Sequence, residues 1–283
     1  MFLDQLSGMP LHPCMSLEQE DPDHYTEANR KMWNLTAGIH YKSYVEGLMT
    51  MIADPAYSTL DAVEKEVFNR IGLAGKDVVQ LACNNGRELI SLKRAGARRC
   101  LGIDISDQFL DQGRRLAEAA GEEVEFQQAD LMKLGTAHDG QFDLVYITIG
   151  ALGWLPDLEA LLELITRLLR PGGCLFIYEM HPILNMFKSG DSLELAHSYF
   201  ETQPYYEESG EDYMDPESVV RAGSYWFHHK LSDVIGGCLR HGLRITFFEE
   251  YPHDISMVFH RMEQVSARPP LCYALTVVKD RPR

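Results

Sequence analysis

Four polar positions, each placed at or just after the end of an apolar run, could together bind a nucleoside. The run 78–81 leads into the short turn 82–86, and Asp104, Asp130 and Thr148 follow or end three later runs. Small residues in such a turn allow the backbone to approach a ligand closely. An acidic residue about twenty positions further on can accept hydrogen bonds from ribose hydroxyls. The order and spacing of these positions therefore predict a nucleoside site.

Each of these residues also has a simpler explanation, because an aspartate after a strand often caps the next helix. Asp104 or Asp130 alone would be weak evidence, whereas the four features in one order favour a cofactor site. The turn itself is poor in glycine and keeps only Gly86, although Asn84 and Asn85 adopt left-handed conformations more easily than most residues. No Gly-x-Gly-x-x-Gly follows the first run, which argues against a dinucleotide-dependent dehydrogenase.

Alternating strands and helices must position these residues. We predict strands at residues 77–82, 100–105, 124–128, 142–148 and 174–179, and helices at 86–94, from Ser106-Asp107 onward, and at 157–169, the last closed by Arg170-Pro171-Gly172-Gly173. The apolar runs are short and nearly continuous, as in strands that are buried on both faces of a parallel sheet. The pattern predicts a doubly wound α/β fold with its ligand at the carboxyl ends of the strands.

Flanking segments complete a single predicted domain over residues 1–283. We expect a loose lead-in to about residue 22, helices at 23–52 and 59–71, a strand pair at 198–206 and 219–227, a helix at 231–241, and strands at 243–250 and 272–279. The predicted parts are an N-terminal helical lid (1–72), a cofactor-binding core (73–181), a substrate cap insertion (182–228) and a C-terminal core (229–283).

The composition excludes several classes of partner. The net charge is −16, from 26 basic and 42 acidic side chains, so nucleic acid is an unlikely ligand. The six cysteines form no Cys-x-x-Cys pair, which argues against a disulfide framework or a metal site. No signal segment and no apolar stretch of about 18 residues is visible, so we expect a cytoplasmic protein without membrane contact, as a monomer or homodimer.

In these motifs the chain resembles the class I S-adenosylmethionine-dependent methyltransferases. The family's motifs match residues 80–86 (QLACNNG), 102–106 (GIDIS), 128–131 (QADL), 142–146 (FDLVY) and 169–173 (LRPGG). It is similar, more narrowly, to a bacterial subgroup that acts on small molecules, through Trp33-Asn34, His40, and residues 81–83, 150–157 and 179–182. The resemblance implies a Rossmann-like seven-stranded sheet with helices on both faces, and S-adenosylmethionine as cofactor, with S-adenosylhomocysteine as product.

The expected cofactor contacts come from the strand ends and the N-terminal helix. They are Ala82, Cys83, Asn84, Gly86, Asp104 for the ribose, Ile105, Asp130 and the Leu131 N–H for the adenine, and Thr148 beneath the methionine part. The resemblance further implies that Tyr25, Trp33 and His40 fold over the cofactor as a lid. Two departures from the family stand out, namely Gln80 in place of an acidic residue, and Ala82 and Asn84 in place of glycines.

The expected reaction is transfer of a methyl group to N, O or S of a small-molecule acceptor by in-line displacement. The alternative is a non-catalytic or differently acting S-adenosylmethionine-binding protein on the same fold. His181 is the candidate general base, or else hydrogen-bonds a loop before a proline. We expect the acceptor to contact Tyr44, Trp154, His181 and Tyr225, and we expect no metal.

Overall fold

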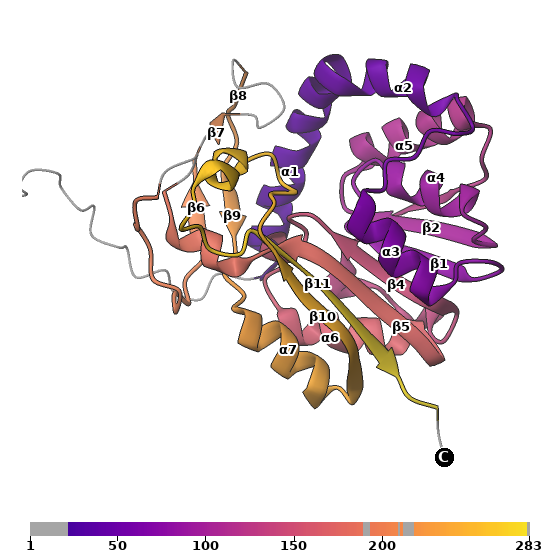
Figure 1. Cartoon of the computed structure of the whole chain (residues 1–283). Coiled ribbons are helices and arrows are strands. Elements are labelled where there is room, and N and C mark those ends of the chain that lie inside the picture. The colour runs from indigo at the N-terminus through magenta and orange to yellow at the C-terminus, as the bar shows by residue number, and fades with distance from the viewer. Residues whose placement is uncertain (1–21, 189–192, 209, 212–217, 282–283) are drawn as a thin grey trace, which may run out of the picture.

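The computed structural model describes residues 22–188, 193–208, 210–211 and 218–281. Its centre is a seven-stranded sheet in the order β10-β11-β5-β4-β1-β2-β3 (Figure 1). The strands are β1 (Asp77–Leu81), β2 (Arg99–Asp104), β3 (Glu125–Gln128), β4 (Phe142–Thr148), β5 (Leu169–Met180), β10 (Leu243–Tyr251) and β11 (Cys272–Lys279). Strands β1 to β5 are parallel, while β11 is antiparallel to both neighbours. The predicted seven-stranded α/β fold class is confirmed.

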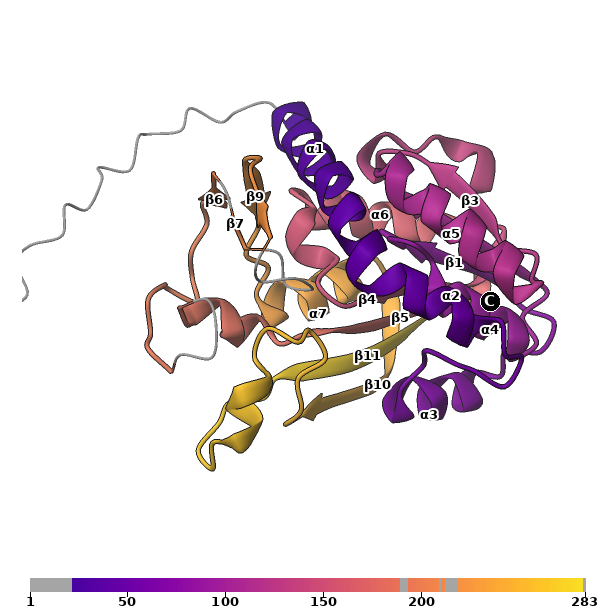
Figure 2. The same cartoon turned by 90° about the horizontal axis from the view of Figure 1, so that it is seen from above.

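Helices cover both faces of this sheet (Figures 1 and 2). One face carries α3 (Ala62–Ile71), α4 (Arg87–Arg94) and α5 (Asp107–Ala120), and the other carries α6 (Leu158–Leu168) and α7 (Leu231–Arg240). Three helices begin at a side-chain cap: Asp61 accepts from the Glu64 N–H, Ser106 from that of Phe109, and Asp157 from that of Ala160. Each cap stabilises its helix by about 1 kcal/mol and fixes the residue at which the helix begins.

Aromatic packing holds α3 against the sheet. The Phe68 ring lies 5.2 Å from those of Tyr146 on β4 and Phe176 on β5, edge to face in both cases. All three side chains are buried. A Phe68→Ala change would remove both contacts and leave a cavity, at a cost of roughly 3–5 kcal/mol. This packing fixes β4 and β5, whose carboxyl ends carry polar residues.

The N-terminal helices differ from the single helix predicted at 23–52. The chain forms α1 (Pro22–His40), a π-helical turn (Tyr41–Val45) and α2 (Glu46–Ile52) without a break. A π-turn holds an extra residue, and this rotates the side chains that follow it relative to those before. Helix α1 contacts α5 on one side and the insertion on the other, so it bridges the two (Figure 2).

The insertion is less regular than predicted. Strand β6 (Tyr205–Glu207) pairs with β9 (Ser224–Trp226), and β7 (Gly210–Glu211) pairs with β8 (Val219–Val220). The predicted strand at 198–206 is wrong in its first part, because the Glu201 N–H bonds the Ser198 carbonyl in a turn. The predicted lead-in lies outside the described residues up to residue 21.

The strand predicted at 174–179 begins earlier than expected, because β5 already includes Leu169 and the segment 170–173 that follows the end of α6. Leu169 already pairs with Phe142, and the register then shifts before Leu144 pairs with Cys174. The irregularity absorbs the extra residues, so the strand continues past a proline and two glycines. Short 3-10 turns complete the fold at Leu131–Lys133, Thr136–His138, Leu152–Trp154, Pro182–Met186 and His260–Gln264.

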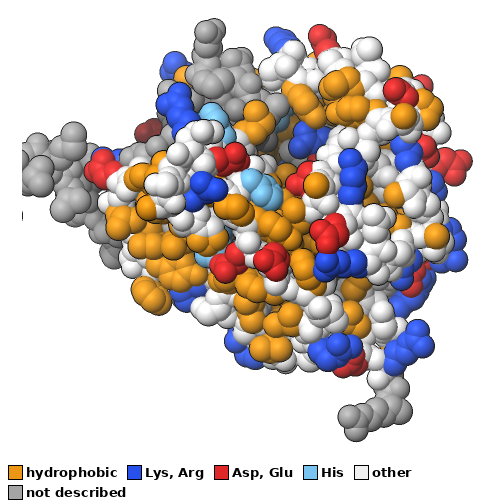
Figure 3. Space-filling model, viewed as in Figure 1, with side chains coloured by type: hydrophobic (Ala, Val, Ile, Leu, Met, Phe, Trp, Pro, Cys, Tyr) orange, Lys and Arg blue, Asp and Glu red, His pale blue; other side chains and the backbone are white. Residues whose placement is uncertain are grey.

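The described part of the chain contains no helix that is long and apolar enough to cross a membrane. Acidic and basic side chains are interspersed over the face shown in Figure 3, which has no continuous basic area among the described residues. Those residues also include no group of three or more His, Cys, Asp or Glu that could hold a metal ion.

Candidate ligand site

The turn after β1 is built from left-handed residues that are mostly not glycine. Ala82, Asn84 and Gly86 have φ angles of 50°, 53° and 60°. Asn84 therefore adopts the left-handed conformation that its residue type suggested. Asn85 does not, and Ala82 adopts it instead. Non-glycine residues in this region store backbone strain, which persists only where the surroundings fix the conformation. The strain marks this turn as a constrained and candidate functional element.

Asp104 at the end of β2 is what fixes the turn. Its carboxylate accepts the Asn84 N–H at 2.7 Å and the Ser106 N–H at 2.8 Å. Burial raises the pKa of Asp104 to about 6, and these backbone bonds oppose that rise. The carboxylate thus joins two strand ends and still borders a cavity. This is the arrangement expected of a group that binds a ligand's hydroxyls.

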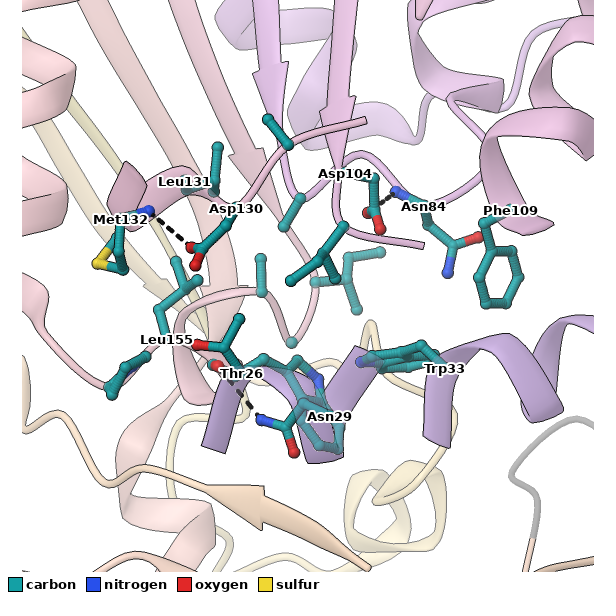
Figure 4. A pocket seen from close by; sticks show the side chains of 18 residues that line it. Thr26, Asn29, Trp33, Asn84, Asp104, Phe109, Asp130, Leu131, Met132 and Leu155 are labelled. Carbon is teal, nitrogen blue, oxygen red and sulfur yellow. Dashed lines mark hydrogen bonds between the residues drawn. The ribbon is translucent and has the colours of Figure 1, made fainter. Parts of the chain in front are cut away.

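A first cavity opens between the strand ends and helix α1. It encloses about 840 Å³, part of it open to solvent, which is enough for a nucleoside. Figure 4 shows Thr26, Asn29 and Trp33 of α1 facing Asp104 and Asp130 across this space. The other lining residues are Ala82, Asn84, Ile105, Phe109, Ala129, Leu131, Met132, Ile149, Gly150, Ala151, Trp154, Leu155 and Pro156. The first cavity thus gathers most of the predicted cofactor residues.

Asp130 both caps a turn and lines the first cavity. Its carboxylate caps a 3-10 turn by accepting the Met132 N–H at 2.9 Å. The same side chain lines the first cavity, next to the buried side chain of Leu131. A capping bond uses one carboxylate oxygen and holds the other in a defined direction, so the cap preorganises the residue for a ligand.

A second cavity lies on the other side of the turn. It encloses about 810 Å³, partly open to solvent, and shares Ala82, Asn84 and Ile149 with the first. The remaining lining residues are His40, Tyr44, Gln80, Cys83, Asn85, Arg87, Glu88, Thr148, Ile255, Ser256 and Met257. A ligand that crosses the shared wall would therefore reach from Asp104 to the residues around Gln80.

The wall between the two cavities is a strained loop held by a buried carboxylate. Ile149 has a φ of 35° and Gly150 one of 76°. Glu179 accepts hydrogen bonds from the N–H groups of Gly150 and Leu152, the latter at 3.2 Å. Burial raises the pKa of this carboxyl group, against the effect of the backbone bonds. Glu179 thus positions the residue that separates the cavities.

His181 lies beside the two cavities but lines neither of them. It borders a third cavity of about 340 Å³. Glu179 on β5 and Trp226 of the insertion line the same cavity. Its Nδ1 accepts the Ile183 N–H at 3.1 Å, and its Nε2 lies 2.9 Å from a carboxylate oxygen of Glu250. Burial lowers the pKa of His181, although Glu250 opposes this. The role of this histidine as a base stays a prediction.

Three other predicted residues also lie outside the first two cavities. Tyr25 and Tyr225 pack ring against ring at 4.7 Å, and Tyr25 also contacts the ring of Phe227. They therefore join α1 to the insertion. Gly86 is required by geometry, because a Cβ there would lie 2.5 Å from the Phe126 ring.

Several lining residues were missed from the sequence. Thr26 and Asn29 share a helix face with Trp33, at a spacing of three and four residues, and that periodicity could have identified them. Arg87 and Glu88 follow the turn directly, but the sequence shows no sign that they point into a cavity. Residues 255–257 come from the long connection between β10 and β11, where no local signal could identify them.

Comparison with known proteins identifies the family of the segment that carries the turn and the strand ends. Residues 78–173 match the family model described as a methyltransferase domain. Residues 78–173 therefore form a methyltransferase domain. The resemblance inferred from the motifs is thereby confirmed. The matched segment contains β1, β2, β3 and β4, and hence the turn, Asp104 and Asp130.

Curated relatives of the methyltransferase domain match over part of their length. A ubiquinone biosynthesis O-methyltransferase of Aromatoleum aromaticum is 33% identical over 105 residues, which is 37% of this chain and 44% of the relative. A demethylmenaquinone methyltransferase of Thermus thermophilus is 38% identical over 110 residues, 38% of this chain and 49% of the relative. This chain therefore spans about half the length of these relatives.

Solved structures share the fold at low sequence identity. An S-adenosylmethionine-dependent methyltransferase of Clostridium acetobutylicum has a TM-score of 0.56 and 14% identity, covering 88% of this chain and 99% of its own. Geranyl diphosphate C-methyltransferase of Streptomyces coelicolor, solved with Mg²⁺, geranyl diphosphate and S-adenosylhomocysteine, has a TM-score of 0.52 and 13% identity, covering 76% and 78%. At such identities, the likeness supports the fold of the methyltransferase domain.

Proposed function

We propose that this protein binds S-adenosylmethionine and transfers its methyl group to a small-molecule acceptor. The observation that carries the proposal is Asp104, whose carboxylate is bonded to the strained turn and borders the first cavity. In this proposal the first cavity holds the nucleoside part of the cofactor, with Asp104 at the ribose and Asp130 at the adenine. The second cavity, which includes Thr148, holds the methionine part.

The residues of both cavities suit such a ligand. The first is lined by apolar and aromatic side chains around two carboxylates, as a planar base with polar sugar groups requires. In the second, the buried amide oxygen of Gln80 has no hydrogen-bond partner among the described residues. A buried polar atom of this kind is stabilised when a ligand supplies the missing donor. The chain therefore offers both an apolar and a polar binding region.

The chain's own contribution to catalysis is positioning and exclusion of water. When bound, S-adenosylmethionine would supply a methyl group on a sulfonium, whose carbon an acceptor atom attacks in line while the C–S bond breaks and S-adenosylhomocysteine leaves as a neutral thioether. The turn, Asp104 and the Glu179-held loop fix the direction from which an acceptor can approach. Trp33, which lies 5.0 Å from the Trp154 ring, covers the first cavity from α1. Fixed geometry and removal of water account for much of the rate enhancement of such reactions.

The acceptor in this proposal is a small molecule that accepts at N, O or S. An O-methyltransferase among the curated relatives supports that class of acceptor. Tyr44 lines the second cavity and Trp154 the first, so both can lie near an acceptor. His181 remains our candidate for the group that takes a proton from it, and Tyr225 contributes through the packing of the insertion. A cytoplasmic, monomeric or homodimeric protein is part of the same proposal.

Binding calorimetry with S-adenosylhomocysteine tests the cofactor assignment. We expect Asp104→Asn to weaken binding at least tenfold, because the neutral amide forms weaker hydrogen bonds with ribose hydroxyls than a carboxylate does. The matched control is Asp111→Asn on the exposed face of α5, which should bind as the wild type does. Failure of the wild-type protein to bind the ligand at all would contradict the proposal.

The alternative is a protein that binds the cofactor without transferring methyl groups. It is favoured by the non-glycine residue Ala82 in a left-handed conformation, since strain there could reflect altered ligand contacts. A screen of amines, phenols, carboxylates and thiols for methylated product separates the two functions. Tight cofactor binding with no product from any acceptor class would support the alternative.

A further inference from the structure

We propose that Gln80 and Glu88 together form a binding site for a primary ammonium group in the second cavity. The inference rests on the proposed function, in which that group is the amino group of the cofactor's methionine part. Helix α4 then supplies the negative charge that strand β1 lacks, because residue 80 is a neutral glutamine. Glu88, eight positions after Gln80, would thus replace the acidic residue that the family has at position 80.

The first observation is the state of Gln80. Its side chain is 2% exposed, at the end of β1, and it lines the second cavity. The amide oxygen is buried and accepts no hydrogen bond from any described residue. Buried side-chain oxygens in native proteins nearly always have a donor, so this one is expected to receive its donor from a ligand. An ammonium group, which carries three N–H donors and no acceptor, meets that need.

The second observation is the way Glu88 is held. Its side chain is 10% exposed and lines the same cavity. Arg87 donates from Nε to Oε1 of Glu88 at 2.7 Å, which leaves Oε2 for a ligand. Arg87 also donates to the Tyr44 hydroxyl at 2.8 Å, and its guanidinium lies 5.3 Å from the centre of that ring. Glu88 is therefore fixed by a chain of contacts that begins in the π-helical turn of the N-terminal helices.

The charges around this point favour a cation. Glu88 is accompanied by one lining cation, Arg87, which is already engaged with it. The pKa of Glu64 is raised to about 7, mainly by burial and in addition by the nearby negative charge of Glu88. The remaining polar residues that line this cavity carry no negative charge at neutral pH, namely His40, Tyr44, Asn84, Asn85, Thr148 and Ser256. An anionic ligand group would face a carboxylate and a carbonyl oxygen, whereas an ammonium would bond both.

The test compares two ligands that differ only in this group. Calorimetry is performed with S-adenosylhomocysteine and with its analogue in which hydrogen replaces the amino group. Glu88→Gln should weaken binding of S-adenosylhomocysteine roughly tenfold to a hundredfold, as expected for one charge-assisted hydrogen bond, and change the affinity for the deaminated analogue less than twofold. The matched control is Glu122→Gln, which alters a carboxylate paired with Arg94 outside the two cavities and should leave both affinities unchanged.

Two further variants keep the inference testable if Glu88→Gln folds poorly. Gln80→Met removes the unpartnered oxygen at similar volume and should produce the same ligand-selective loss. Gln80→Glu, added to Glu88→Gln, should restore at least fivefold of the lost affinity, because it returns the charge to the same ammonium group. Equal losses for both ligands, or no recovery by Gln80→Glu, would overturn the inference. Failure of the wild type to bind either ligand would instead contradict the proposed function.

Discussion

At the residue scale, the site contains carboxylate side chains that form hydrogen bonds with the backbone and so hold it in place. Asp104 fixes the turn, Asp130 caps a 3-10 turn, and Glu179 holds the loop at Gly150. Each carboxylate would have looked structural if taken alone, and each nevertheless borders a cavity. A carboxylate with four lone-pair sites can serve a backbone N–H and a ligand together. Structural and functional explanations of these residues are therefore compatible.

His181 provides the test at this scale. Burial lowers the pKa of the His181 imidazole, so the side chain is neutral at pH 7. It becomes protonated only at a pH below the ordinary pKa of a histidine. If it acts as a base, turnover should fall as the pH drops through that lowered pKa. His181→Ala should reduce turnover by roughly 10²- to 10⁴-fold and leave the affinity for S-adenosylhomocysteine within twofold.

The measurement for His181 is a pH–rate profile of both proteins with an identified acceptor. The wild-type profile should lose activity on the acid side, and the variant should lack that limb. Unchanged turnover in His181→Ala would remove this residue as the base. The preserved cofactor affinity is the control for folding, because the residue borders only the third cavity.

At the scale of elements, helix α5 closely approaches the turn after β1. A Cβ at Gly113 would lie 2.7 Å from the backbone oxygen of Asn85 and 2.8 Å from the Phe126 ring. Neither group can yield easily, since one is main chain and the other packs within the core. Helix α5 therefore packs directly against the turn, and a side chain at Gly113 would require the helix or the turn to shift.

We expect Gly113→Ala to destabilise the fold by about 1–3 kcal/mol and to weaken binding of S-adenosylhomocysteine, because the helix would press on the turn. Gly135→Ala is the matched control, since a Cβ at Gly135 meets nothing within 4 Å and its φ of −68° suits any residue. Urea unfolding and calorimetry of both variants provide the measurements. A Gly113→Ala protein as stable as the control would show that the helix can move aside without cost.

At the scale of the whole molecule, helix α1 connects the cofactor loops to the insertion. Asn34 donates to the Asp107 carboxylate at 2.8 Å and accepts from the Ser106 hydroxyl at 2.6 Å. Asn29 bonds both the N–H and the carbonyl of Tyr225 on β9, at 2.7 and 2.9 Å. Since α1 also covers the first cavity, its position should respond to a bound ligand.

We expect Asn29→Ala to loosen α1, because it removes both hydrogen bonds that the Asn29 side chain makes to the Tyr225 backbone on β9. Hydrogen exchange over residues 22–40 should quicken in this variant, and S-adenosylhomocysteine should slow exchange over the same segment in the wild type. Leu35→Ala is the control, since that side chain is 55% exposed. Exchange in Asn29→Ala equal to that of the control would contradict a bridging role for α1.

The sequence by itself determined the strands, the turn, and the carboxylates at the strand ends. These features are local: a buried strand requires a continuous apolar run, and its end requires a polar turn. Asp104, Asp130 and Thr148 could be placed for the same reason, because parallel strands bring their carboxyl ends to one edge of a sheet.

Only the tertiary structure decided which other side chains join them. Tyr44, Glu88 and Ser256 come from three distant segments, and they line one cavity because helices and a long connection pack over the same sheet edge. The same packing brings the rings of Tyr25 and Tyr225 together, although they lie 200 positions apart in the sequence. Such contacts depend on the angles between elements, which no short stretch of sequence encodes. The family of the fold could therefore be read from the sequence, whereas the placement of Gln80 and Glu88 around one cavity became visible only in three dimensions.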